Sequence, residues 1–255
     1  KIATTEDLIE LSNTSGDWDK HFIQTADISF GEDETQVDWN NSGAAGPAEG
    51  FSPIGNSTTD FSGSYDGGEY TISNLYINRS STNAVGLLGF TDGADISEIG
   101  TENCDITGQG YVGGLVGYNK NSTISNSYST GSISGETNAG GLVGYNYNST
   151  ISNCYSKVDV TRSSDSGDNV GGFCGYNRSS TIEYCYSIGN VYYDGDTDPT
   201  GKGFVGDEWE ATSTYTANFF DSEASNQSTD AVGSATHKTT TEMTTDALAY
   251  DYTDN

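Results

Sequence analysis

The chain has 255 residues and a formal net charge of −28, because 37 acidic side chains stand against only 9 basic ones. A surface this acidic repels nucleic-acid phosphates and anionic lipid headgroups, so we expect neither partner. No apolar run reaches the roughly 18 residues of a membrane-spanning helix, so we also expect no membrane insertion within this chain. The amino terminus, KIATTEDL, has no basic segment followed by an apolar one, and we expect that any export signal has been removed.

The first predicted element is a short helix at the amino terminus. Thr4 and Asp7 have the spacing of a capping box, and apolar residues such as Leu8 and Leu11 would form one stripe of the helix. We expect this helix to cover one end of the fold, within an N-terminal cap and entry strands at residues 1–62.

Five segments of similar sequence follow from residue 71 onwards. The stretch GGLVGYN occurs at 113–119 and again at 140–146. The leading isoleucines of the five segments are Ile72, Ile96, Ile124, Ile151 and Ile182, in steps of 24, 28, 27 and 31 residues. A repeat of this length indicates a solenoid, in which each segment lies on the one before.

Each repeat contains short β-branched runs separated by Gly, Asn and Ser, which predicts one β-coil per repeat. Stacked coils place like residues above one another, about 4.8 Å apart. The predicted apolar ladders are the leading isoleucines, then Leu87, Leu115, Leu142, Phe173 and Phe204, and then Ile106, Ile133, Val160 and Val191. Polar and aromatic rows should stack in the same way: Tyr118, Tyr145 and Tyr176, each followed by an asparagine.

The fold class predicted from these ladders is all-β: a single-stranded, right-handed parallel β-helix, or β-solenoid, with the short N-terminal capping helix. The right hand is expected because crossovers between parallel strands strongly favour it. We expect the coils to span 63–212 and a final coil with a polar tail to span 213–255, all within one continuous domain.

The sequence GLVGYN followed by a TISNCYS-type strand resembles the GLUG motif repeat of bacterial and archaeal surface proteins. The segments FSPIG at 51–55 and FSGSYDGGEYTISNLYI at 61–77 resemble the region that precedes such repeats, and HKTTTEMTTDAL at 237–248 resembles their usual ending. The resemblance implies parallel β-helix coils in an adhesin-like surface protein. It says little about activity, because these repeats accompany adhesins, accessory regions of proteases and proteins of unknown role.

The sequence offers few groups for catalysis. Lysines and arginines are scattered at predicted turns, and no pair of carboxylates recurs beside any of them, so we expect no catalytic residue, no cofactor certain to bind and no enzyme. Asp194, Asp196 and Asp198 alternate like the start of a calcium-binding loop. Pro199 replaces the expected turn glycine, and no glutamate follows at the twelfth position. The sequence therefore allows either calcium or a plain acidic loop.

Two further features concern covalent chemistry. Cys154 and Cys185 occupy the same place in successive repeats, which allows either a disulfide between stacked coils or buried free thiols. Eight sequons predict a glycoprotein, at Asn13, Asn40, Asn56, Asn78, Asn121, Asn148, Asn177 and Asn226. The sequence suggests that Asn121, Asn148 and Asn177 recur at one turn, so glycans there would form a row.

The composition and the repeats predict a non-enzymatic extracellular, cell-surface or envelope protein. It would serve as an adhesin stalk, or as a subunit of a sheath, surface layer or filament that self-associates by strand-edge pairing; surface proteins and glycans are the other expected partners. One alternative is a carbohydrate-binding or polysaccharide-cleaving β-helix that uses an outer row of Tyr76, Tyr128, Tyr155 and Tyr186. A second alternative is an ice-binding solenoid that uses outward Thr and Ser beside the leading isoleucines.

Overall fold

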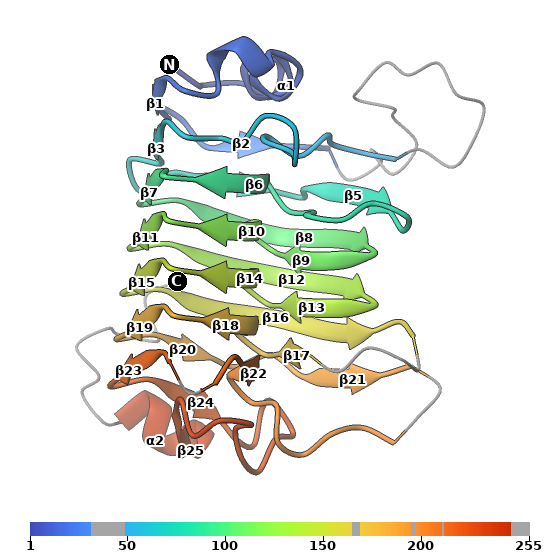
Figure 1. Cartoon of the computed structure of the whole chain (residues 1–255), viewed down its shortest axis with the longest axis vertical. Helices are drawn as coiled ribbons and strands as arrows, with labels where there is room; N and C mark the ends of the chain where they lie inside the picture. The colour runs from blue at the N-terminus through green and yellow to red at the C-terminus, as the bar shows by residue number, and fades with distance from the viewer. Residues whose placement is uncertain (32–48, 165–168, 195–196, 211, 246–255) are drawn as a thin grey trace.

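The structure is a computed structural model that describes residues 1–31, 49–164, 169–194, 197–210 and 212–245. Parallel strands stack coil upon coil into a β-solenoid, with a helix at its amino-terminal end (Figure 1). The predicted fold class of an all-β solenoid with a short capping helix is confirmed. None of the helices in the described residues is long and apolar enough to span a membrane.

The first sheet contains the leading isoleucines. Its parallel strands, in spatial order, are β1 (His21–Ile23), β3 (Ser64–Asp66), β7 (Asp95–Ser97), β11 (Thr123–Ser125), β15 (Thr150–Ser152), β19 (Thr181–Glu183) and β23 (Thr214–Thr216). Ile96, Ile124, Ile151 and Ile182 stand in one register and are fully buried. This ladder is confirmed for these four residues.

The predicted place of Ile72 in that ladder is wrong. Ile72 lies in β4 (Thr71–Ser73) of another sheet, where it pairs with Ile28 and Thr101. Tyr65, only 1% exposed, pairs with Ile96 instead. Residues 71–73 repeat the letters TIS but lie one strand further along the coil, because a turn at Gly67–Tyr70 separates them from β3.

The second sheet follows the Leu/Phe ladder. Its strands are β22 (Val205–Glu208), β18 (Cys174–Arg178), β14 (Val143–Tyr147), β10 (Val116–Lys120) and β6 (Leu88–Asp92). Leu87, Leu115, Leu142, Phe173 and Phe204 precede these strands, and all five are fully buried. The Leu115 amide donates to the Leu142 carbonyl at 3.1 Å, and the rings of Phe173 and Phe204 stack at 4.6 Å. This predicted ladder is confirmed.

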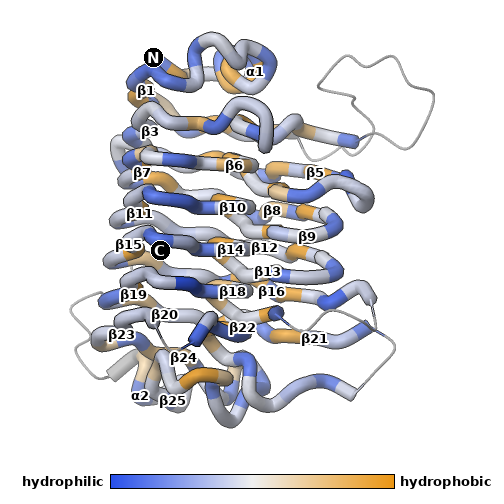
Figure 2. The backbone as a smooth tube through the Cα atoms, viewed as in Figure 1, coloured by the Kyte–Doolittle hydropathy of each residue, from blue (hydrophilic) through white to orange (hydrophobic). Residues whose placement is uncertain are grey.

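The third sheet is the widest. Its strands are β2 (Ile28–Ser29), β4, β8 (Gly100–Gly108), β12 (Tyr128–Gly135), β16 (Tyr155–Arg162), β20 (Tyr186–Ser187), β24 (Phe219–Asp221) and β25 (Thr236–Lys238), with β5 (Tyr76–Arg79) beside β8 and β21 (Val191–Tyr193) beside β16. Ile106, Ile133, Val160 and Val191 stand in register as predicted. A short fourth sheet contains β9 (Gly110–Gly113), β13 (Thr137–Gly140) and β17 (Val170–Gly171). Figure 2 shows hydrophobic segments recurring at corresponding places on successive coils.

Helices cover both ends of the described solenoid. At the amino-terminal end, α1 (Thr5–Asn13) begins with the predicted capping box between Thr4 and Asp7, and a 3-10 turn, η1 (Ser15–Asp17), follows it. Leu8 of α1 is fully buried. At the other end lies α2 (Thr240–Thr245). Because both ends are covered, the apolar ladders inside do not end in solvent.

Candidate functional site

A chain of buried asparagines runs along the inside of the second sheet. Thr91 Oγ1 donates to Asn119 Oδ1 at 2.8 Å, and Asn119 Nδ2 donates to Asn146 Oδ1 at 2.8 Å. Asn146 Nδ2 donates to Asn177 Oδ1 at 2.9 Å, and Asn177 Nδ2 donates to the Tyr215 hydroxyl at 3.0 Å. The three asparagines are fully buried. Each amide meets its counterpart only when the coils are in this register, so the row specifies the alignment of the coils.

This position of Asn177 makes the prediction of a glycan there wrong for the folded chain. Its amide nitrogen is buried and hydrogen-bonded, which leaves no room for a sugar. The predicted row of three sequon asparagines is wrong as well: Asn177 aligns with Asn119 and Asn146, each of which lies two residues before Asn121 or Asn148. The residue that follows Arg178 in the third coil is Ser179, which stands where the other coils have those two asparagines.

The remaining sequons differ in exposure. Exposed asparagines of this set are Asn13, Asn56, Asn121, Asn148 and Asn226. Asn78 is half-buried, and Asn40 lies outside the described residues. Asn148 Nδ2 donates to Asn121 Oδ1 at 2.5 Å, and Asn121 Nδ2 donates to Asp92 Oδ1 at 2.7 Å. Glycosylation at these exposed positions stays a prediction.

The predicted stacked row of Tyr118, Tyr145 and Tyr176 is present on the second sheet and is longer than expected. Tyr118 and Tyr145 stack at 4.7 Å between ring centroids, and Tyr145 and Tyr176 stack at 5.3 Å. Phe90 extends the row above Tyr118 at 4.3 Å, and Tyr111 packs edge-on against both Tyr118 and Tyr145. The rings cover the outer side of the same strands whose inner side holds the asparagines.

A second tyrosine row lies on the third sheet. Tyr128 and Tyr155 stack at 4.7 Å with rings 4° from parallel, and Tyr155 and Tyr186 stack at 5.0 Å. Tyr76, which we expected in this row, pairs with Asp105 at a different place along the coil, so that part of the prediction is wrong. Both errors, for Tyr76 and for Ile72, come from the same wrong alignment of residues 71–77 with the later repeats.

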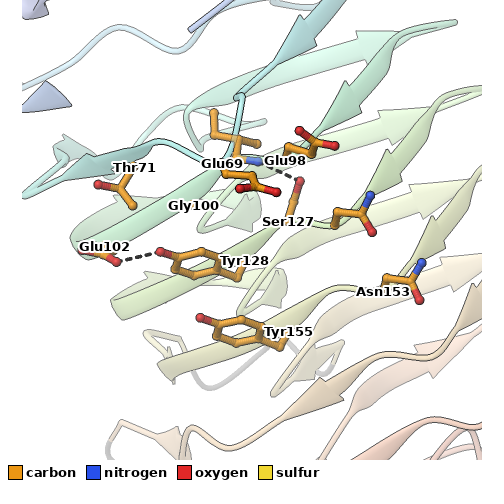
Figure 3. Close-up of a pocket in the computed structure, with 11 residues that line it drawn as sticks. Glu69, Thr71, Glu98, Gly100, Glu102, Ser127, Tyr128, Asn153 and Tyr155 are labelled. Carbon is orange, nitrogen blue, oxygen red and sulfur yellow. Dashed lines mark hydrogen bonds between the residues drawn. The ribbon is translucent and has the colours of Figure 1, made fainter. Parts of the chain in front are cut away.

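A groove of about 650 Å³ opens where this second row ends, above Tyr128 (Figure 3). In register above Tyr128 stands Gly100, which has no side chain, so the row of rings stops there. A Cβ atom at Gly100 would lie 2.3 Å from Cζ of Tyr128, because the ring of Tyr128 occupies that space. The groove is lined by Glu69, Glu98 and Glu102 and by Asn126, Asn153, Tyr128 and Tyr155, among others.

The polar groups of the groove are partly fixed by hydrogen bonds. The Tyr128 hydroxyl donates to Glu102 Oε1 at 2.7 Å, and the Ile99 amide donates to Ser127 Oγ at 3.3 Å (Figure 3). Burial, followed by the bond to Glu102, raises the pKa of Tyr128 well above its ordinary value, so its hydroxyl is protonated at neutral pH. It therefore remains a hydrogen-bond donor held in place by Glu102.

One of the glutamates, Glu98, stands in a column of left-handed backbone positions at the turn between the first and third sheets. The φ angles in this column are 54° at Glu98, 49° at Asn126, 54° at Asn153 and 57° at Tyr184, while Glu69, with φ 64°, lies in the longer turn Gly67–Tyr70 of the coil above. Asparagine tolerates this conformation well, and glutamate does not share that preference. We did not predict these glutamates; the signal was that DISE at 95–98 replaces the TISN of the next two repeats.

All four cysteines are buried free thiols. Cys154 and Cys185 lie one above the other, and the Cys154 amide donates to Cys185 Sγ at 3.4 Å. Burial raises the pKa of the Cys104 thiol to about 12 and that of Cys174 further still. The structure thus has the thiol alternative that the sequence allowed, in place of the disulfide.

The predicted calcium loop falls partly outside the described residues, because Asp196 is not among them. Asp194 and Asp198 are exposed, and Asp198 Oδ1 accepts a hydrogen bond from the Tyr193 amide at 2.9 Å. Within the described part of the chain, no group of three or more His, Cys, Asp or Glu is placed to hold a metal ion. Calcium binding at this loop stays a prediction.

Comparison with known proteins agrees with the repeat. The GLUG motif matches residues 108–134, 135–161 and 166–192. Over 138 residues the chain is 36% identical to halomucin of Haloquadratum walsbyi, a stretch that is 52% of this chain and 1% of halomucin. Its fold resembles the crystal structure of a "putative immunoglobulin A1 protease" from Bacteroides ovatus, with a TM-score of 0.53 and 19% identity over 86% of this chain and 63% of that one.

At this level of identity the likeness to the Bacteroides ovatus protein concerns the fold alone. The matched share of halomucin is too small to transfer the role of the whole protein. The motif matches, by contrast, coincide with the coils that contain the asparagine, tyrosine and Leu/Phe rows. The chain thus carries three consecutive GLUG motifs, which form successive coils of its β-solenoid.

Proposed function

We propose that this chain is a non-enzymatic structural module of an extracellular or cell-surface protein, a stiff spacer in an adhesin-like stalk. The observation that carries the proposal is the set of side-chain rows that run from coil to coil, the apolar and asparagine rows inside and the aromatic rows outside. Apolar, amide and aromatic side chains each contact their own kind above and below. Such packing makes a solenoid whose coils support one another along one axis.

The surface and the comparisons support an exposed location. The charge of −28 keeps the protein hydrated and soluble in a saline medium. The GLUG motifs and the similarity to halomucin point in the same direction. Exposed sequons such as Asn121 and Asn148 would suit a glycosylated surface.

The covered ends support a spacer in preference to a filament subunit that pairs by its strand edges. Helix α1 lies over the first coil, and at the other end Asp230 Oδ1 accepts the hydrogen bond of the Val205 amide at the edge of β22, at 2.8 Å. A neighbouring chain would have to displace these groups to add a strand. Self-association of this kind is therefore not part of the proposal.

The ice-binding alternative depends on a flat row of threonines on the first sheet. Thr123, Thr150, Thr181 and Thr214 do stand in one register. Asp95 precedes this row in the same register, and Glu183 interrupts the neighbouring row of serines. These charges break the regular surface that such an array requires, so the row does not support this function.

Antibodies against the solenoid would test the proposed location on source cells. We expect labelling of intact cells and a monodisperse, elongated particle by small-angle X-ray scattering of the purified chain. Labelling that appears only after the cells are made permeable would contradict the surface location. A purified chain that polymerises through its ends would contradict the spacer role.

A further inference from the structure

We propose that the groove above Tyr128 binds an oligosaccharide that carries no acidic groups. The proposal concerns a local site, and it goes beyond the spacer role of the whole module. It begins with the end of the tyrosine row: Tyr128 has Tyr155 stacked below it, and Gly100, which has no side chain, stands in register above it. The groove of about 650 Å³ opens at this point.

The chemistry of the lining matches a saccharide. Sugar hydroxyls donate hydrogen bonds to carboxylates such as Glu69 and Glu98, and they accept them from amides such as those of Asn126 and Asn153. Tyr155 and the backbone of Gly100 pack against the two faces of the Tyr128 ring, so the ring edges of Tyr128 and Tyr155 form the aromatic part of the lining against which the apolar C–H face of a sugar can pack. A cavity with an aromatic wall and a few converging polar groups is typical of small-ligand sites.

The charge of the groove defines the class of saccharide. Among the residues that the structure describes, three glutamates line the groove and no lysine, arginine or histidine does. Uronic acids and sulfated sugars would be repelled by these carboxylates, while neutral sugars and protonated amino sugars would not. Negative charge elsewhere on the chain adds to this selection.

The left-handed column at this turn runs past the groove. Glu98, Asn126 and Asn153 of this column line the groove, while Tyr184, in the same conformation, lies outside it. The backbone conformation therefore does not by itself mark the site, but it provides equivalent positions inside and outside the groove for substitution.

The same column provides a matched pair of variants. Glu98→Asn installs the residue of the two coils below, so it should fold with an unfolding midpoint equal to or higher than that of the wild type. It also removes a carboxylate from the groove. Tyr184→Asn makes the same kind of change at a column position outside the groove, where the side chain is 54% exposed. Tyr128→Leu removes the aromatic wall.

The experiment is saturation-transfer NMR and calorimetry on the whole chain with neutral, amino and uronic-acid oligosaccharides. We expect binding of neutral or amino oligosaccharides at millimolar concentration or tighter, a loss of about tenfold or more in Glu98→Asn and Tyr128→Leu, and no change in Tyr184→Asn. No binding, or binding of uronic acids alone, would overturn the proposal. So would binding that all three variants retain, or binding of a lysine-rich peptide in place of any saccharide.

Discussion

At the scale of single residues, the buried asparagine row is the feature in which the loss of one side chain should matter most, because each buried amide depends on its neighbours for hydrogen bonds. A buried amide without a hydrogen-bond partner destabilises the fold by its full desolvation free energy, whereas a hydrogen-bonded buried amide stabilises the fold only modestly. Asn146 is the central member, bonded to Asn119 on one side and Asn177 on the other. Its removal leaves a buried donor and a buried acceptor without partners.

We therefore expect Asn146→Ala to lower the free energy of unfolding by about 2–4 kcal/mol, measured by urea denaturation. The control is Asn13→Ala at an exposed position near the end of α1, which should change it by less than about 0.5 kcal/mol. Equal effects of the two substitutions would show that the row does not stabilise the coils.

The cysteines allow a second test at this scale. Burial raises the pKa of Cys104 to about 12, and all four thiols are shielded from solvent. At pH 8 the folded chain should not react with Ellman's reagent, because the reactive form is the thiolate. After unfolding in guanidinium chloride, four thiols should react. Two reactive thiols and a mass 2 Da lower would instead reveal a bridge.

At the scale of the coil, the glycines of the repeated GGLVG stretch explain why that stretch recurs. The backbone of one coil passes so close to the next that a side chain does not fit. A Cβ atom at Gly141 would lie 2.3 Å from the Gly172 carbonyl oxygen and 1.9 Å from Ser156 Oγ. Each coil makes this same approach, so each repeat needs the same residue there.

Gly141→Ala should accordingly destabilise the chain by about 3 kcal/mol, because the backbone of the neighbouring coil has to shift. Thermal unfolding followed by circular dichroism measures the change. Gly16→Ala serves as the comparison, since a Cβ atom there would meet no atom within 4 Å. If Gly141→Ala proved as stable as Gly16→Ala, close coil packing would not be the reason for the repeat.

The coil is also the scale at which the sequence was most and least informative. Like residues at equivalent positions of the repeat predicted three ladders, because in stacked parallel coils each side chain lies beside its counterpart in the next coil. The prediction for the first coil was wrong because TIS at 71–73 has the same sequence as the first-sheet strands of later coils. In the structure Tyr65, not Ile72, pairs with Ile96 in the buried ladder of the first sheet. The groove was missed because its glutamates stand at turns, where a single sequence gives no sign of a cavity between coils.

At the scale of the whole molecule, the solenoid depends on the register between coils, that is, on which residue of one coil lies beside which residue of the next. Lys120 and Tyr147 occupy equivalent positions, so residues 120–146 make up one complete coil of 27 residues. Removing these residues joins Asn119 to Tyr147 and preserves every row. Removing one residue more shifts the following strands by one place and turns their apolar side chains outward.

We expect the chain without residues 120–146 to fold cooperatively with a lower melting temperature, and the chain without residues 120–147 to fail to fold. Circular dichroism and size-exclusion chromatography would compare the two. Equal behaviour of the two deletions would mean that the rows of like side chains do not specify the structure. Stability in a stack of this kind rises with the number of coils in contact.

The asparagine row has a further consequence, because every donor in it points the same way. From Thr91 to Tyr215 each group donates towards the carboxyl-terminal end, and the Tyr215 hydroxyl finally donates to Glu208 Oε2 at 2.9 Å. The aligned amides form an electric dipole along the solenoid, with a carboxylate at its positive end. The two ends of the row therefore carry opposite partial charges. A coil inserted in the reverse orientation would place an amide N–H of the row against another N–H.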